Sequence, residues 1–164
     1  MKKTLLPVIL VLAFLAACTE EAPRAELLEY NIGGNLYSSK GYAYRYSDYL
    51  GYEKQGYDWH IYNLGMSSLY IQAYDSTYEK TIFQYPAFEA ELTVELANGT
   101  SKTYQAAGGE FRLTGHDMGE VVGDFHIKVK NTSNPLDSLM INSGYFRIWL
   151  EKYDRIFTAG QNRK

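Results

Sequence analysis

The sequence predicts a single all-β domain, and three observations support that prediction. Apolar and polar residues alternate with a period of two in several segments, as they do in strands that bury one face. Turn signals at hairpin spacing separate these segments, and Asn98-Gly99 is the strongest of them. No segment has the apolar spacing of an amphipathic helix. We therefore expect an antiparallel β-sandwich of about eight to ten short strands, with an up-and-down, lipocalin-like barrel as the alternative.

The N-terminal residues 1–17 have a composition different from the rest. Lys2 and Lys3 precede an apolar run that ends in Leu15-Ala16-Ala17-Cys18, and Cys18 is the only cysteine. The run contains Pro7 and is shorter than the roughly 20 apolar residues of a membrane-spanning helix. This stretch resembles a bacterial lipoprotein signal peptide with its lipobox. The resemblance implies cleavage before Cys18, a diacylglycerol on its thiol, and a further acyl chain, such as palmitate, on the new amine.

Residues 18–25 (CTEEAPRA) are expected to form a short lipidated tether. Thr19 in place of Asp resembles the sorting preference of outer-membrane lipoproteins. Glu20-Glu21 partly resembles the surface-export signal of lipoproteins from Bacteroidota. The sequence thus predicts a protein anchored in the outer membrane by lipid, at its periplasmic face or on the cell surface.

Charge and cysteine content exclude several functions. Loss of Lys2 and Lys3 would leave 14 basic against 19 acidic residues, and such an acidic protein is a poor partner for nucleic acid. With Cys18 acylated, no thiol remains for a disulfide, a metal ligand or a nucleophile. We expect no cofactor and no metal, because the three histidines lack a spacing typical of zinc sites.

Residues 26–158 are predicted to form the β domain, followed by a polar tail over residues 159–164. Alternation is clearest at 88–96, 124–130 and 145–150. Lys102 is expected to compensate charge on the acidic outer face of the strand that contains Glu89, Glu91 and Glu95. Shorter strands are predicted at 27–32, 35–39, 57–63, 69–74, 81–85, 103–106 and 110–114.

Glycines and aromatic residues carry a second resemblance, over about half of the mature chain. The segments are 30–37 (YNIGGNLY), 113–117 (LTGHD), 122–127 (VGDFHI) and 140–146 (MINSGYF). They resemble a pattern in small uncharacterised β-rich lipoproteins of Bacteroidota. That resemblance implies no activity.

Tyrosine is the most unusual feature of the domain, because 11 of the 16 tyrosines lie between Tyr42 and Tyr85. In an extended strand Tyr42, Tyr44 and Tyr46 share one face, and Tyr49, Tyr52 and Tyr57 are expected in a glycine-rich loop. Such rings can serve the sheet itself, a protein interface or stacking on sugars. The candidate ligand-binding residues are Tyr42, Tyr44, Tyr46, Tyr49 and Trp59.

The remaining motifs do not indicate catalysis. No nucleophile elbow, P-loop or HExxH motif is present, and the glutamates are better explained as a solvated strand face. Asp137-Ser138-Leu139 resembles the O-glycosylation site of Bacteroidota, with Ser138 as the acceptor. The sequence thus predicts a non-catalytic binding or structural module with a protein partner. A glycan-binding lipoprotein is the main alternative, and a hydrolase is the weakest.

Overall fold

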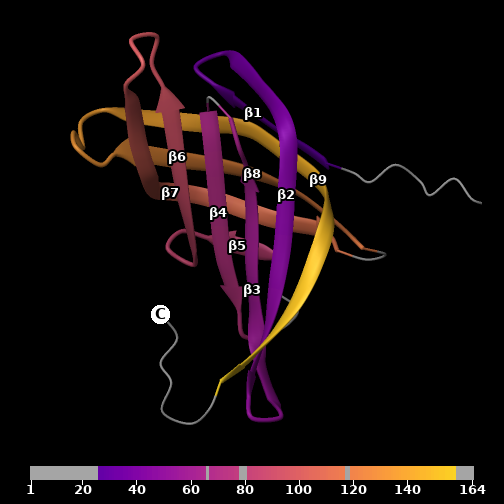
Figure 1. Cartoon of the computed structure of the whole chain (residues 1–164). Helices are drawn as coiled ribbons and strands as arrows, with labels where there is room; N and C mark the ends of the chain where they lie inside the picture. The colour runs from indigo at the N-terminus through magenta and orange to yellow at the C-terminus, as the bar shows by residue number, and fades with distance from the viewer. Residues whose placement is uncertain (1–25, 66, 78–80, 117–118, 158–164) are drawn as a thin grey trace, which may run out of the picture.

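The computed structural model describes residues 26–65, 67–77, 81–116 and 119–157, which contain nine strands and no helix (Figure 1). The all-β prediction is confirmed. Cys18, the predicted leader, the tether and the tail at 159–164 lie outside the described residues. No helix that could cross a membrane occurs among those residues. The strands are β1 (Glu26–Ile32), β2 (Asn35–Leu50), β3 (Glu53–Asn63), β4 (Ser67–Asp75), β5 (Ile82–Gln84), β6 (Phe88–Glu95), β7 (Ser101–Gly115), β8 (Glu120–Asn131) and β9 (Ser138–Phe157).

All nine strands belong to one sheet, which closes on itself. The strand order is β5-β7-β6-β4-β3-β2-β1-β9-β8, and β8 also pairs with β7. Neighbours are antiparallel except for the end of β9, which pairs with β2 in parallel where β1 no longer lies between them. Strand β5 pairs with β7 alone among the described strands.

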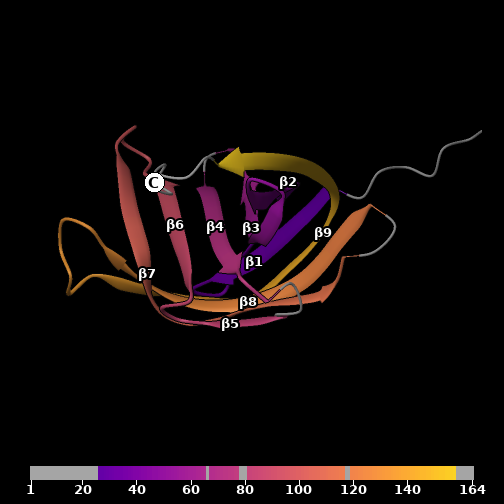
Figure 2. The same ribbon diagram turned by 90° about the horizontal axis from the view of Figure 1, so that it is seen from below.

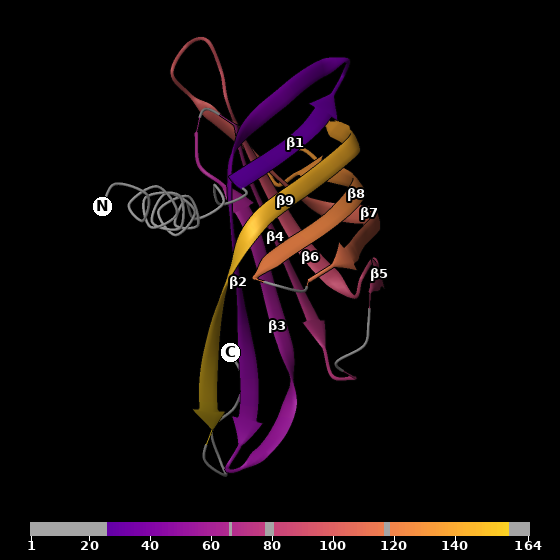
Figure 3. The same cartoon turned by 90° about the vertical axis from the view of Figure 1, so that its right-hand side faces the viewer.

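The closed sheet is flattened into two layers whose strands cross steeply. In Figure 1, β2, β3, β4 and β6 run vertically in front of β8 and the first half of β9. Figure 2 shows β5 and β8 in the opposite layer, across the interior from β4 and β6. Strands that bend from one layer into the other are the usual corners of such an orthogonal packing. Figure 3 shows the β2–β3 hairpin and the end of β9 projecting beyond the layer that contains β5 and β8.

A bulge in β7 makes one of these corners. The first residues of β7, up to Gln105, pair with β6 on one side, and β7 pairs with β8 on the other side from Tyr104 onward, with a register shift between Ala106 and Gly108. Gly109 follows with a φ of 105°, and a side chain there would collide with the backbone carbonyl of His126. The left-handed backbone and the close approach both require glycine.

The core lies between the two layers and is rich in aromatic rings. Phe111 stacks on Phe146 at 5.7 Å between ring centroids, and Phe125 packs against both Phe146 and Tyr30. Tyr30 is fully buried, and its hydroxyl lies 2.9 Å from Ser67 Oγ. Along β6 the inward residues are buried and the glutamates between them are exposed, as the alternation predicts.

The structure corrects three local expectations. The predicted glycine-rich loop around Tyr49–Tyr57 is a tight hairpin, because β2 continues to Leu50 and β3 begins at Glu53. The predicted strands at 103–106 and 110–114 are one bulged strand, β7. Lys102 lies opposite Val94 and forms an ion pair with Asp137 at 2.8 Å, so it does not neutralise the glutamates of β6.

Candidate functional site: a tyrosine face

The outward side chains of β2, β3 and β4 gather six of the 16 tyrosines on one surface. Ala43 lies in the core, so Tyr42, Tyr44 and Tyr46 point outward along β2, on one face as expected. The register places Tyr62 beside Tyr42, and Tyr70 beside Tyr62. Strand β9 adds Tyr153 beside Tyr46. We call this surface the tyrosine face; its members are Tyr42, Tyr44, Tyr46, Tyr62, Tyr70, Tyr74 and Tyr153.

The rings of the tyrosine face hold one another in place. Tyr42 stacks on Tyr62 with 5.2 Å between ring centroids. Tyr44 contacts the edge of Tyr46 at 5.3 Å, and Tyr46 contacts Tyr153 at 5.6 Å. The six tyrosines on β2, β3 and β4 are half-buried. Because packing already restricts these rings, a ligand or partner would lose little side-chain entropy on meeting them.

A buried set of charges lies under the rings. Asp48 and Asp58 are almost inaccessible although they lie on the outer face. The Arg155 guanidinium donates to Asp48 Oδ1 at 2.8 Å and to Asp58 Oδ2 at 2.6 Å, and it lies 4.0 Å from the centroid of the Tyr46 ring. Burial by itself would raise the pKa of Asp58, but His60, Gln72 and Arg155 outweigh it, so the pKa lies below its ordinary value.

His60 occupies the middle of this set. Tyr44 covers its ring at 4.3 Å, while its Nδ1 lies 2.5 Å from the Tyr70 hydroxyl and its Nε2 lies 3.1 Å from Asp58 Oδ2. Burial, followed by the nearby Tyr44 and Asp58, raises the pKa of Tyr70. Tyr70 is therefore a neutral phenol at physiological pH, and it donates a hydrogen bond to Gln72 Oε1. This network fixes the rings from below.

An acidic groove borders the tyrosine face along β6. A hollow of about 630 Å³ lies between Tyr70 and Tyr85, and Glu89, Glu91 and Gln105 line it. A second hollow of about 480 Å³ continues past Gln72 and Glu89. Both glutamates are exposed, and neither forms an ion pair among the described residues. The groove therefore has aromatic walls and uncompensated negative charge.

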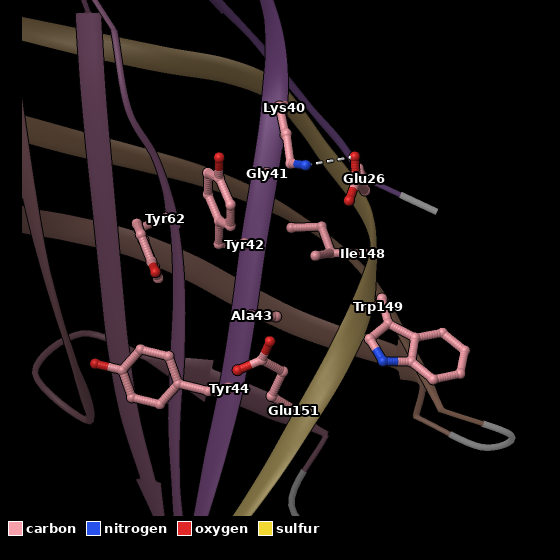
Figure 4. A pocket seen from close by; sticks show the side chains of 10 residues that line it. All are labelled: Glu26, Lys40, Gly41, Tyr42, Ala43, Tyr44, Tyr62, Ile148, Trp149 and Glu151. Carbon is pink, nitrogen blue, oxygen red and sulfur yellow. Dashed lines mark ion pairs between the residues drawn. The ribbon is translucent and has the colours of Figure 1, made fainter. Parts of the chain in front are cut away.

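A smaller pocket of about 210 Å³ opens where β1 begins and β2 separates from β9 (Figure 4). Tyr42 and Tyr62 stand on one side, with the Lys40–Glu26 ion pair at 2.8 Å above them and Glu151 below. Trp149 points away from the two tyrosines. The pocket offers ring faces beside charged hydrogen-bonding groups.

The predicted site residues separate into three groups. Tyr42, Tyr44 and Tyr46 lie together on the tyrosine face. Tyr49 lies beyond a bulge after Asp48 and has no ring contact with another described aromatic residue. Trp59 does not lie on the tyrosine face, because its side chain is only 2% exposed and packs in the core beside Tyr57.

Other predicted positions lie apart from this face. Ser138 is exposed at the start of β9, beside Asp137, whose carboxylate accepts a hydrogen bond from Lys102. His126 is exposed on β8 opposite Glu110, and His116 lies at the end of β7 against Trp59. No group of three or more possible metal ligands occurs in the part of the chain that the structure describes.

Sequence reasoning missed Tyr62, Tyr70 and Arg155, which complete the site. Arg155 reaches the face through the pairing of β9 with β2, which are far apart in the chain, so no local motif marks it. Tyr62 and Tyr70 lie on β3 and β4, which follow β2 in consecutive hairpins. The alternation of Asp58, His60 and Tyr62 in β3 is the one signal that could have placed Tyr62 opposite the tyrosines of β2.

Comparisons with known proteins give no relative from which to transfer a function. No protein-family model matches the chain, and no match was found among curated proteins or solved structures.

Proposed function

We propose that this protein is an outer-membrane or cell-surface lipoprotein, anchored through Cys18, that works as a non-catalytic binding module. In this proposal the tyrosine face and its acidic groove dock a protein partner. The observation that supports it is the pre-packed aromatic surface bordered by Glu89 and Glu91, which have no basic neighbour in ion-pair contact among the described residues.

The chemistry of the face favours a basic partner segment. Tyrosine gives large contact area at low entropic cost, and its ring face attracts lysine and arginine. The chain itself uses its tyrosines in this way, since Arg155 lies over Tyr46 and Lys40 lies 5.4 Å from the Tyr42 centroid. Unpaired carboxylates beside such rings would steer and select positive charge.

The small pocket at Tyr42 supports glycan binding as a second candidate. Stacked rings beside Lys40, Glu26 and Glu151 suit the C–H face and hydroxyls of a sugar unit. Affinity electrophoresis in polysaccharide gels tests this candidate. Retardation of the wild type that is lost in Tyr42→Ala would favour a glycan, and equal mobility in every gel would count against it.

The partner proposal is tested in the native host with an epitope-tagged chain. We expect one protein to co-purify with the wild type and to be depleted at least about tenfold with the variant Tyr85→Ser/Glu89→Gln/Glu91→Gln. Tyr145→Ser is the matched control, because Tyr145 is 39% exposed on the other layer and Tyr85 is 46% exposed at the groove. Equal recovery with both variants would argue against the acidic groove beside the tyrosine face as the docking surface.

A separate experiment tests the anchor. Cys18→Ser should abolish incorporation of a clickable fatty acid and leave an uncleaved precursor. Labelling that persists in this variant would refute the lipobox assignment, whatever the outcome of the partner experiment.

A further inference from the structure

The end of β9, over residues 151–157, pairs with a neighbour on one side only among the described residues. Strand β8 accompanies β9 as far as Trp149, and the Leu150 N–H donates to the carbonyl of Gly119 at 2.7 Å. From Glu151 onward the described partner of β9 is β2 alone, in parallel and without a register shift. Figure 3 shows this end of β9 at the margin of the projecting β2–β3 hairpin. An open strand edge of this length is a template for another strand.

The open edge presents backbone groups from alternate residues. In an extended strand, successive residues direct their N–H and C=O groups to opposite sides. Because the Leu150 N–H points to the β8 side, Lys152, Asp154 and Ile156 direct their backbone groups to the same, open side. Their side chains are exposed, and neither Lys152 nor Asp154 forms an ion pair among the described residues. A strand that pairs here would bond these backbone groups and meet these two charges.

The sequence of this edge is complementary to itself in the antiparallel orientation. When Tyr153 lies opposite its own copy, Lys152 lies opposite Asp154 of the second strand. In the same register Glu151 lies opposite Arg155. A two-fold axis exchanges the strands, so each of these pairs occurs twice. Opposite charges directly across a strand pair stabilise it, whereas like charges destabilise it.

The same side chains disfavour the neighbouring registers. A pairing centred on Lys152 places that lysine opposite its own copy, and a pairing centred on Asp154 does the same for the aspartate. A register centred between two residues would place backbone groups that point to the open side opposite groups that point away from it. The charges and the backbone therefore select one register, with Tyr153 at its centre.

We propose that a second copy of this chain binds at the open edge of β9 and forms a two-fold symmetric antiparallel strand pair centred on Tyr153. The pairing continues the sheet of β3, β2 and β9 into the second copy. It also brings Ile156, which is 70% exposed, opposite Leu150. Charges that serve only to protect a strand edge need no such complementarity.

The proposal is separate from the docking of a protein partner, because the acidic groove lies at β6, on the far side of β3 and β4 from this edge. The contact is small, so we expect it where copies are crowded in the envelope and not in dilute solution. In this respect alone it rests on the proposed location, which the Cys18→Ser experiment tests independently.

The test is disulfide formation in intact cells of the native host that produce the full chain. At a non-hydrogen-bonded antiparallel pair the two Cα atoms are about 4.5 Å apart, which a disulfide can span. Tyr153→Cys should therefore give a reducible dimer on mild oxidation, and the wild type controls for Cys18. Glu151→Cys is the matched control, because this exposed position lies opposite residue 155 and about 13 Å along the strand from its own counterpart. It should give at least about tenfold less dimer.

Charge exchange tests the register separately. Added to Tyr153→Cys, either Lys152→Glu or Asp154→Lys places like charges opposite each other twice and should reduce the dimer at least about fivefold. Produced together in one cell, these two variants form complementary pairs at both positions, so a mixed dimer should return. A Tyr153→Cys dimer no stronger than that of the wild type or of Glu151→Cys, or one insensitive to charge exchange, would overturn the proposal.

Discussion

Asp58 keeps a charge at a position where a strand side chain would ordinarily meet water. Its carboxylate is covered by the tyrosine face and accepts hydrogen bonds from Gln72 Nε2 at 3.0 Å and from Arg155. Such a group is stabilising only while it is ionised and all its partners are present. The pKa of Asp58 below its ordinary value therefore ties stability to pH.

We expect the wild type to lose stability as the pH falls from about 4 through the lowered pKa of Asp58. The folded state binds the proton less readily than the unfolded state, so its advantage exists above the unfolded pKa and disappears in acid. Asp58→Asn should cost about 1–3 kcal/mol at pH 7, and it should flatten the acid dependence of the free energy of unfolding. Urea titrations across this pH range measure both effects.

Asp154→Asn is the control, because Asp154 is exposed next to Arg155 in sequence. It should leave the acid dependence unchanged. If Asp58→Asn shows the same acid dependence as the wild type, the stabilising role of this carboxylate is wrong.

At the scale of single residues, the sequence predicts which side chains share a face of a strand but not which face is buried. The alternation predicted that Tyr42, Tyr44 and Tyr46 lie on one face of the strand, and this prediction is confirmed. In β3 both alternating sets contain aromatic or ionisable residues, so local pattern could not show that Trp59 faces the core and His60 faces outward. Only pairing with β2 and β4 fixes that choice.

The bulge of β7 is the element that turns the sheet from one layer to the other. Gly108 and Gly109 are adjacent, but only Gly109 has left-handed backbone and a carbonyl in the space of a side chain. An added Cβ at Gly108 would meet its nearest neighbour, Lys128 Cβ, at an ordinary 3.8 Å.

Gly109→Ala should therefore cost about 1–3 kcal/mol or more from backbone strain, while Gly108→Ala should be close to neutral. Thermal unfolding of the two variants measures the difference. Equal melting temperatures would contradict the assignment of the corner to Gly109.

The sequence predicted where strands form, but it did not predict that two neighbouring strand segments join into one continuous strand. The Asn98-Gly99 signal and the alternation at 88–96 correctly gave the β6–β7 hairpin. The glycines at 108 and 109 suggested a break, because a bulge and a turn use the same residues. The tertiary pairing with β8 keeps β7 extended through that point.

At the scale of the whole molecule, the additional pairing of β9 with β2 completes the candidate site. The parallel contact between β2 and the end of β9 brings Tyr153 and Arg155 onto the tyrosine face from the far end of the chain. Such long-range contacts leave no periodic trace in the sequence. The all-β class was therefore predictable, whereas the closed order and the composition of the face required the structure.

The most direct test of the central claim is photo-crosslinking in intact cell envelopes. A photoreactive residue replaces Tyr85 at the acidic groove in one variant and Tyr145 on the opposite layer in another. We predict a discrete protein adduct from position 85 that weakens with added salt and with Glu89→Gln/Glu91→Gln, and no such adduct from position 145. Adducts from both positions with equal yield, or from position 145 alone, would contradict the assignment of the tyrosine face as the docking surface.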